Sequence, residues 1–208
     1  MPRDLKIRCA CGALQGSVRG VSPAEGNHAV CYCDDCQAFQ HFLGRAADVL
    51  DPHGGTEVFQ TSAARVSFDA GSERLACMRL SPRGTCRWYA GCCNTPVGNT
   101  APTAGIPLVG LVARCLERPT DDPSLERSLG PIRWRVFTKF AKGDISAVPA
   151  GESFASAVIR TVRLVLRWRL RGDHKRTPFF AAGSARLIVE PRVLSLEERN
   201  ELRRRVAA

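Results

Sequence analysis

The sequence predicts an α+β protein, with a β-rich domain of antiparallel strands over residues 1–120 and a basic, mostly helical extension over residues 121–208. Two observations predict this division. Short β-favouring runs separated by turn residues fill the first half, whereas the longest run with helical spacing falls in the second. Residues 1–120 hold 12 Lys/Arg and 10 Asp/Glu, and residues 121–208 hold 18 and 10. We place the boundary near residue 120, in the polar, Pro-bounded segment 117–124.

The first half is expected to form eight strands. Gly71-Ser72 predicts a hairpin turn, and residues 81–84 predict a four-residue turn between two strands. The expected strands are Leu5–Cys9, Leu14–Arg19, His28–Cys33, Thr56–Thr61, Ala64–Asp69, Arg74–Leu80, Thr85–Ala90 and Ile106–Leu116.

One helix is expected within this β-rich half, from Asp34 to just before Gly44. The carboxylate of Asp34 can cap its first turn, and Gln37 can reach back from three residues later. Gly44 supplies the residue that ends a helix without a steric penalty. Cys36 therefore lies in the first turn, where the partial positive charge of the helix terminus favours a thiolate over a thiol.

The cysteine content points to intracellular metal chemistry rather than to disulfides. Ten cysteines occur among 208 residues. The N-terminal residues alternate charged and apolar side chains where an export signal would be continuously apolar, and no apolar run approaches the ~20 residues that span a bilayer. We therefore expect a cytoplasmic protein without a transmembrane segment, whose clustered thiols serve as ligands or catalysts.

Seven of the cysteines fall into three tight groups, and their spacing predicts two zinc ions. Alternate residues of a strand share a face, so the two thiols of a C-x-C pair can share one ion. A C-x-C-x-x-C group at a helix start brings three thiolates together and leaves a fourth position open, as in catalytic zinc sites. A C-C pair in a turn could join the first C-x-C in a four-thiolate structural site. The groups are Cys9 and Cys11; Cys31, Cys33 and Cys36; and Cys92 and Cys93.

Other interpretations of the thiols and histidines remain open at this level. Cys77, Cys86 and Cys115 are isolated among apolar strand residues and are expected to be buried free cysteines. Thiolates alone do not fix the metal, so iron–sulfur ligation and a thioredoxin-like Cys33-x-x-Cys36 stay as alternatives. The four histidines lack ligand spacing, and the sequence has no Ser-His-Asp pattern, P-loop or dinucleotide fingerprint.

The cysteine groups also carry a family resemblance. Cys9-x-Cys11-Gly12, Cys31-x-Cys33-x-x-Cys36 and Arg87-Trp88-Tyr89 followed by Cys93 resemble, over residues 5–117, the glutathione-dependent formaldehyde-activating enzyme family, which includes centromere protein V. The resemblance implies a β-rich, Mss4-like fold with two zinc ions. It implies structural roles for Cys9, Cys11 and Cys93 and catalytic roles for Cys31, Cys33 and Cys36.

Three positions depart from the pattern of that family. Ala90 replaces the first cysteine of its later C-x-x-C, so the fourth structural ligand is Cys92, another group, or absent. Adjacent Cys92 and Cys93 can face one ion only if the chain bends there. Tyr32 and Gln37 stand where the family usually has His and Arg, which indicates a changed substrate.

The resemblance implies carbon–sulfur lyase chemistry on a small thiol, such as glutathione, and its hydroxymethyl adduct. Three thiolates blunt the Lewis acidity of a zinc ion, so a soft sulfur ligand suits the open position better than water. Arg45, Arg79 or Arg87 could pair with substrate carboxylates, or could be solvated surface charges. The alternative is a non-catalytic, zinc-stabilised binding module whose basic C-terminal part contacts an anionic partner.

The extension is expected to contain two helices. Residues 153–171 lack acidic residues and carry apolar side chains at helical spacing beside a stripe of arginines, which predicts a basic amphipathic helix ending at Gly172. We expect its apolar side to pack on residues 131–140 or on the β domain, so that it shields the zinc site. Binding of an anionic membrane or nucleic acid is the alternative. A second helix is expected from Ser195, with Glu198 completing a capping box.

Overall fold

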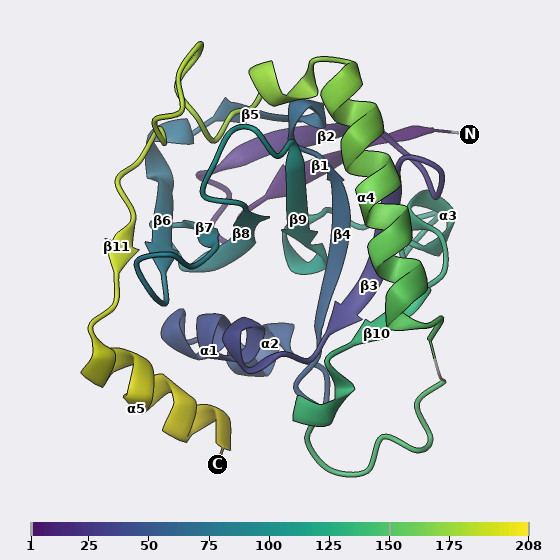
Figure 1. Cartoon of the computed structure of the whole chain (residues 1–208), viewed down its shortest axis with the longest axis vertical. Helices are drawn as coiled ribbons and strands as arrows, with labels where there is room; N and C mark the ends of the chain where they lie inside the picture. The colour runs from purple at the N-terminus through teal and green to yellow at the C-terminus, as the bar shows by residue number, and fades with distance from the viewer. Residues whose placement is uncertain (1, 150, 208) are drawn as a thin grey trace.

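The computed structural model describes residues 2–149 and 151–207 and shows an α+β fold built on a large mixed sheet (Figure 1). A smaller sheet packs against it, and a common apolar core joins the two. The strands are β1 (Arg3–Arg8), β2 (Gln15–Val21), β3 (Gly26–Cys31), β4 (Thr56–Ser62), β5 (Val66–Ala70), β6 (Leu75–Arg79), β7 (Cys86–Ala90), β8 (Thr95–Thr100), β9 (Leu108–Val112), β10 (Trp134–Val136) and β11 (Arg192–Val193). The α-helices are α1 (Asp34–Phe42), α2 (Ala46–Val49), α3 (Glu126–Leu129), α4 (Phe154–Leu170) and α5 (Leu196–Ala207).

The large sheet has the strand order β10-β3-β4-β9-β8-β7-β6-β11, and the small sheet has the order β1-β2-β5. Every pairing among the strands of the first half is antiparallel, as the sequence predicts. The two edge strands of the large sheet come from the second half and run parallel to their neighbours. The C-terminal part therefore closes both edges of the sheet and protects them from pairing with other chains.

Strand β8 is absent from the sequence expectation, because Pro96, Gly98 and Asn99 read as turn residues. Pro96 is tolerated beside the irregularity in the β7–β8 register between Trp88 and Tyr89, where a strand has less need of a backbone donor. Gly98 is required, because a Cβ there would lie 2.5 Å from the carbonyl oxygen of Gly110 on β9. Pro96 and Gly98, which are typical of turns, thus allow β8 to pack closely between its neighbouring strands.

The division near residue 120 stays a prediction. In the structure, residues on both sides of it share one apolar core. Leu125 and Phe179 are fully buried in the cluster that contains the interior of the β sheets. The ring of Phe179 lies 4.9 Å from that of Trp88, measured between centroids. The second half also holds long irregular segments between its helices.

Helix α1 begins at Asp34, but its cap differs from the expected one. The Cys33 thiol accepts a hydrogen bond from the backbone N–H of Cys36, so Cys33 and not Asp34 is the N-cap. The Gln37 side chain donates to the carbonyl of Tyr32 instead of closing a capping box. The helix stops where Gly44 adopts a left-handed conformation, as predicted.

Helix α4 has the predicted extent, but its apolar side is oriented differently from the expectation. Leu164 and Trp168 are buried against the sheet, while Val158, Val162 and Leu166 are 45%, 51% and 55% exposed. Leu166 therefore does not pack on the domain as predicted, while Val158 and Val162 reach it only at a cavity. The expected packing on residues 131–140 is provided by Ala157, which contacts the cluster of Trp134. Arg160 and Arg167 pack on the domain instead, because their guanidinium groups find partners on β3 and on the loop before it.

Helix α5 begins as predicted, with reciprocal hydrogen bonds between Ser195 and Glu198. Helix α5 lies beside α1 (Figure 1). Its Leu202 packs with Phe39 of α1 and with Leu43, which follows α1, in a second apolar cluster. In the part of the chain that the structure describes, no helix is long and apolar enough to cross a membrane.

Candidate metal centres and a cavity beside one of them

Four cysteines from the two ends of the β domain meet in one cluster. Cys9 and Cys11 follow β1, and Cys92 and Cys93 lie in the turn between β7 and β8. The four sulfur atoms lie within 4.8 Å of one another. The closest approaches are 3.4 Å between Cys11 and Cys92, 3.5 Å between Cys9 and Cys11, and 3.8 Å between Cys9 and Cys92.

The local backbone explains how adjacent cysteines reach the same point. The turn bends because the N–H of Cys93 donates to the carbonyl of Ala90 and Asn94 adopts a left-handed conformation. The opposing loop turns at Gly12, whose φ is +78°, and the N–H of Leu14 donates to the Cys9 sulfur at 3.2 Å. Cys92 thereby lies beside Cys9, Cys11 and Cys93, where it could supply the fourth ligand that Ala90 cannot.

This four-cysteine cluster fits a tetrahedral thiolate metal site. Zinc–sulfur bonds of about 2.3 Å place tetrahedral sulfur ligands about 3.8 Å apart, close to the separations seen here. Although burial works against it, a hydrogen bond from Thr95 helps to lower the pKa of Cys93 to about 6, which favours the thiolate that a metal binds. The cluster could hold a metal ion that ties the first strand to the β7–β8 turn.

A second cluster of three cysteines lies where β3 runs into α1. Cys31 ends β3, Cys33 caps α1, and Cys36 lies in its first turn. Their sulfur atoms also lie within 4.8 Å of one another, with Cys31 and Cys33 at 3.4 Å. The three-cysteine cluster could hold a metal ion, with only three thiolates from the described residues converging on it.

The electrostatics of this cluster concentrate negative charge on Cys36. Hydrogen bonds from the thiols of Cys31 and Cys33 lower the pKa of Cys36, and the guanidinium of Arg87 lowers it further. The hydrogen bond to Cys33 raises the pKa of Cys31. Arg87 is 4% exposed and donates to the Cys36 sulfur at 3.9 Å, while its other terminal nitrogen lies 3.5 Å from the Asp35 carboxylate.

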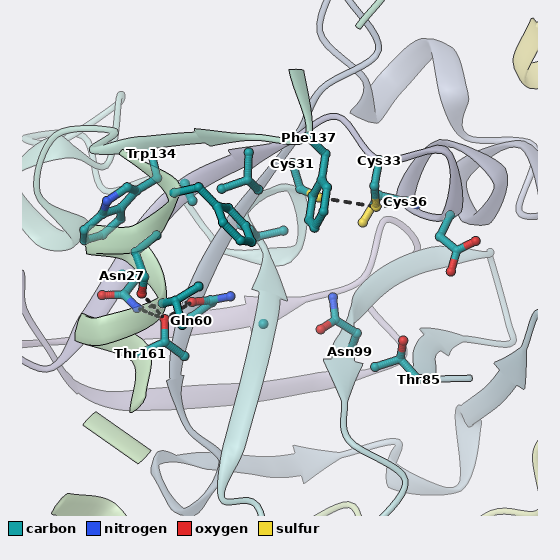
Figure 2. Close-up of a pocket in the computed structure, with 18 of the residues that line it drawn as sticks. Asn27, Cys31, Cys33, Cys36, Gln60, Thr85, Asn99, Trp134, Phe137 and Thr161 are labelled. Atoms are coloured by element: carbon teal, nitrogen blue, oxygen red, sulfur yellow. Dashed lines mark hydrogen bonds between the residues drawn. The ribbon is translucent and has the colours of Figure 1, made fainter. Parts of the chain in front are cut away.

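A cavity of about 440 Å³ opens beside the three-cysteine cluster (Figure 2). Its floor is the face of the large sheet, including Val58 and Asn99. Residues of β10 and of α4 form the wall opposite the cysteines, which supports the expectation that the extension shields this site. The volume lies in the range of small-molecule sites.

The two ends of the cavity differ in chemistry (Figure 2). The three cysteines, Asp35 and Arg87 form one end. At the other, Asn27 donates to Gln60 at 3.1 Å and to Thr161 at 2.9 Å, so the polar groups there are uncharged. Trp134, Phe137 and the valines of α4 make the wall between the two ends apolar.

The other residues considered from the sequence lie away from the cavity. Arg45 pairs with Asp48, and Arg79 donates to Cys86, so Arg87 alone of the three arginines reaches the site. Cys77, Cys86 and Cys115 are buried, as expected. Tyr32 and Gln37 are buried behind the three-cysteine cluster, where Tyr32 donates to Asp51 at 3.1 Å.

Sequence reasoning did not identify the remaining wall of the cavity. Trp134 and Phe137 belong to a three-residue strand and the turn after it, which is too short for a periodic signal. Asn27, Gln60 and Asn99 are single polar residues in strands, and only the sheet register brings them together. No signal in one sequence could have selected them.

Comparisons with known proteins place the chain in a family. A crystal structure of a Rhodobacter sphaeroides protein is similar, with 19% sequence identity and a TM-score of 0.40, over 62% of this chain and 98% of that chain. No curated protein matches the chain. A family model described as a family of unknown function, DUF6151, matches residues 1–190, which include both cysteine clusters and α4. The chain therefore belongs to this family of unknown function.

Proposed function

We propose that this protein is a zinc-dependent carbon–sulfur lyase that makes or breaks the hydroxymethyl adduct of a small thiol in the cavity beside Cys31, Cys33 and Cys36. The β domain is proposed to have the Mss4-like fold of the formaldehyde-activating enzyme and centromere protein V family. In this assignment the four-cysteine cluster holds a structural zinc. The observation that carries the proposal is a three-thiolate cluster opening into a ligand-sized cavity.

The donor set supports a zinc ion with a sulfur ligand. A zinc ion on three thiolates would offer an open position at which a substrate thiol is held as its thiolate. Three thiolates and one dication leave a net charge of −1. The buried guanidinium of Arg87 lies against Cys36 and offsets this charge.

The proposed reaction balances without a further reagent. In the breakdown direction the C–S bond of R–S–CH2–OH breaks, the sulfur keeps the electron pair, and the hydroxyl loses its proton as formaldehyde forms. The Asp35 carboxylate, which lines the cavity beside Arg87, is the proposed acceptor of that proton. The proton then passes to the released thiolate, and the reverse sequence makes the adduct.

The cavity walls support a thiol with an uncharged, largely apolar tail. Glutathione carries two carboxylates and an ammonium group, whereas Arg87 is the one basic side chain among the described residues lining the cavity, and Asp35 and Cys36 already engage it. Burying unpaired carboxylates against Trp134 and Phe137 would be costly. An apolar thiol whose far end hydrogen-bonds to Gln60 or Asn99 suits the walls better.

The test measures exchange between a thiol plus formaldehyde and the hydroxymethyl adduct by NMR, with zinc-loaded protein. We expect faster exchange for benzyl mercaptan than for glutathione. Cys36→Ser should abolish the acceleration, and Cys115→Ala, which removes a buried cysteine outside both clusters, should retain it. No acceleration with any thiol, or equal acceleration by Cys36→Ser, would contradict the proposal.

X-ray absorption of the zinc separates this enzyme from a purely structural role. A change in the sulfur coordination of one zinc on adding benzyl mercaptan is expected. Two four-thiolate sites that do not respond to thiols would instead support the zinc-stabilised binding module.

A further inference from the structure

The outward side of α4 is an apolar surface that is largely exposed. We define the outer face of α4 as Phe154, Val158, Ile159, Val162, Leu166 and Leu170. Their exposed fractions run from 45% for Val158 to 89% for Leu170. Single exposed apolar residues are ordinary, but six on one side of one helix form a contiguous patch, and such patches mark interaction sites.

The contacts of the opposite side fix the orientation of α4, so the outer face cannot turn inward. Trp168 is fully buried. Arg160 donates to the side chain of Asn27 at 2.9 Å and to the carbonyl of Pro23. Arg167 and Arg171 lie 3.0 and 3.5 Å from the carboxylate oxygens of Glu25. A helix that presented its apolar side to the core would break all of these contacts.

The charges around the outer face favour an anionic partner. Helix α4 contains no acidic residue. Arg163 is exposed beside the outer face and has no ion pair within residues 2–149 and 151–207, while Arg169 is also exposed and donates to the carbonyl of Gly105. Residues 121–208 supply most of the net charge of +10. An apolar face bordered by arginines is the pattern of helices that lie in the interface of an anionic bilayer.

We propose that the outer face of α4 docks the protein on an anionic lipid surface. A bilayer offers hydrocarbon to the six apolar side chains and phosphates to the bordering arginines. A second copy of the chain would bring the same positive charge to the contact, and a nucleic acid would leave the apolar side chains without an apolar partner. Six apolar side chains and two exposed arginines would give a reversible peripheral contact, which is typical of a helix that lies in the membrane interface.

The docking surface adjoins the cavity. Phe154, Val158 and Val162 belong to the outer face and also line the cavity, and the ring of Phe137 lies 5.6 Å from that of Phe154. On a bilayer, the cavity would therefore open close to the lipid. This gives an apolar thiol dissolved in the membrane a short path to the three cysteines. That last consequence rests on the proposed function, whereas docking itself does not.

Sedimentation with vesicles tests the proposal on the full, zinc-loaded chain. We expect binding to vesicles of phosphatidylcholine mixed with phosphatidylglycerol, little binding to phosphatidylcholine alone, and weaker binding as salt is raised. Leu166→Glu should weaken binding about tenfold or more. Leu196→Glu is the matched control, since Leu196 is 64% exposed on α5 and outside the outer face, and it should bind as the native chain does.

The tryptophan fluorescence of a variant tests directly whether the outer face of α4 enters the bilayer. Leu166→Trp should show a blue shift of its emission on adding anionic vesicles, while the buried Trp88, Trp134 and Trp168 contribute an unchanged background. Absence of binding, equal loss in Leu166→Glu and Leu196→Glu, or self-association or nucleic-acid binding that Leu166→Glu abolishes would each overturn the proposal. Lyase activity is not a readout here, so failure of docking leaves the proposed reaction to its own test.

Discussion

The guanidinium of Arg87 lies between the sulfur of Cys36, at 3.9 Å, and the carboxylate of Asp35, at 3.5 Å. It is also within 5.6 Å of the centroid of the Phe39 ring, so its position is fixed from three sides. A buried cation of this kind is stable only with its charge partners. Arg87 thus joins β7 to the start of α1 through the group proposed as a zinc ligand.

Replacing Arg87 should loosen metal binding at the three-cysteine cluster specifically. In Arg87→Gln the thiolate charge of Cys36 loses its buried partner, so we expect faster extraction of one zinc by a chelator and unchanged extraction of the other. A colorimetric chelator assay measures both rates. Arg79→Gln, near Cys86 and outside the cavity, is the control. Equal acceleration in both variants would show that Arg87 has no special role.

The two cysteine clusters should respond differently to single substitutions. Cys11→Ser removes a ligand of the site that ties β1 to the β7–β8 turn, so we expect unfolding or aggregation at ordinary temperature. Cys36→Ser should leave a folded protein that lacks one zinc. Thermal melts combined with metal analysis check this, and the opposite ranking would reverse the roles of the clusters.

Trp168 should carry much of the attachment of α4. It is fully buried, and Trp168→Ala leaves a large cavity, so we expect a loss of about 3–5 kcal/mol in the free energy of unfolding. Leu170→Ala, at a residue 89% exposed, should change it by less than about 0.5 kcal/mol. Urea denaturation measures both. Comparable effects would mean that α4 is held by other contacts.

Asp122 should make the region around α3 sensitive to acid. Burial opposes the charge, but the Ser128 hydroxyl at 2.6 Å and the N–H groups of Arg127 and Ser128 lower the pKa of Asp122. Its contribution is therefore present above the unfolded pKa of about 3.9 and is lost as the pH falls through the lower folded value. Asp122→Asn should cost about 1–2 kcal/mol at neutral pH.

The matching measurement for Asp122 is urea denaturation at several pH values. The native protein should lose stability below about pH 4 more steeply than Asp122→Asn does. Parallel curves would show that the Asp122 carboxylate contributes nothing specific.

The sequence was most informative where a local pattern determines structure. Gly44 at the end of α1, the Ser195–Glu198 capping box and the extent of α4 follow from neighbours in the chain, and each was predicted. The hairpin expected at Gly71-Ser72 was wrong, because β5 pairs with β2 in the small sheet while β6 belongs to the large sheet. The grouping of cysteines was also predicted from their spacing, although Cys9 and Cys11 meet in the loop after β1 and not on one face of a strand. That these clusters bind zinc stays a prediction.

The features that were missed depend on contacts between distant residues. Pro96 and Gly98 indicate a turn until the neighbouring strands are known, and then they permit β8. The periodicity of α4 shows an apolar side and a basic side, but only Glu25 and Asn27 determine which of them faces the domain. The cavity walls require the register of β3, β4 and β10, which one sequence does not specify.

Metal content of protein purified without chelator is the most direct test of the account. We expect elemental analysis to give two zinc ions per chain, one for each cysteine cluster, falling to one in Cys36→Ser. A chain that contains no metal, or that contains iron with visible absorption, would contradict the proposed zinc-dependent site.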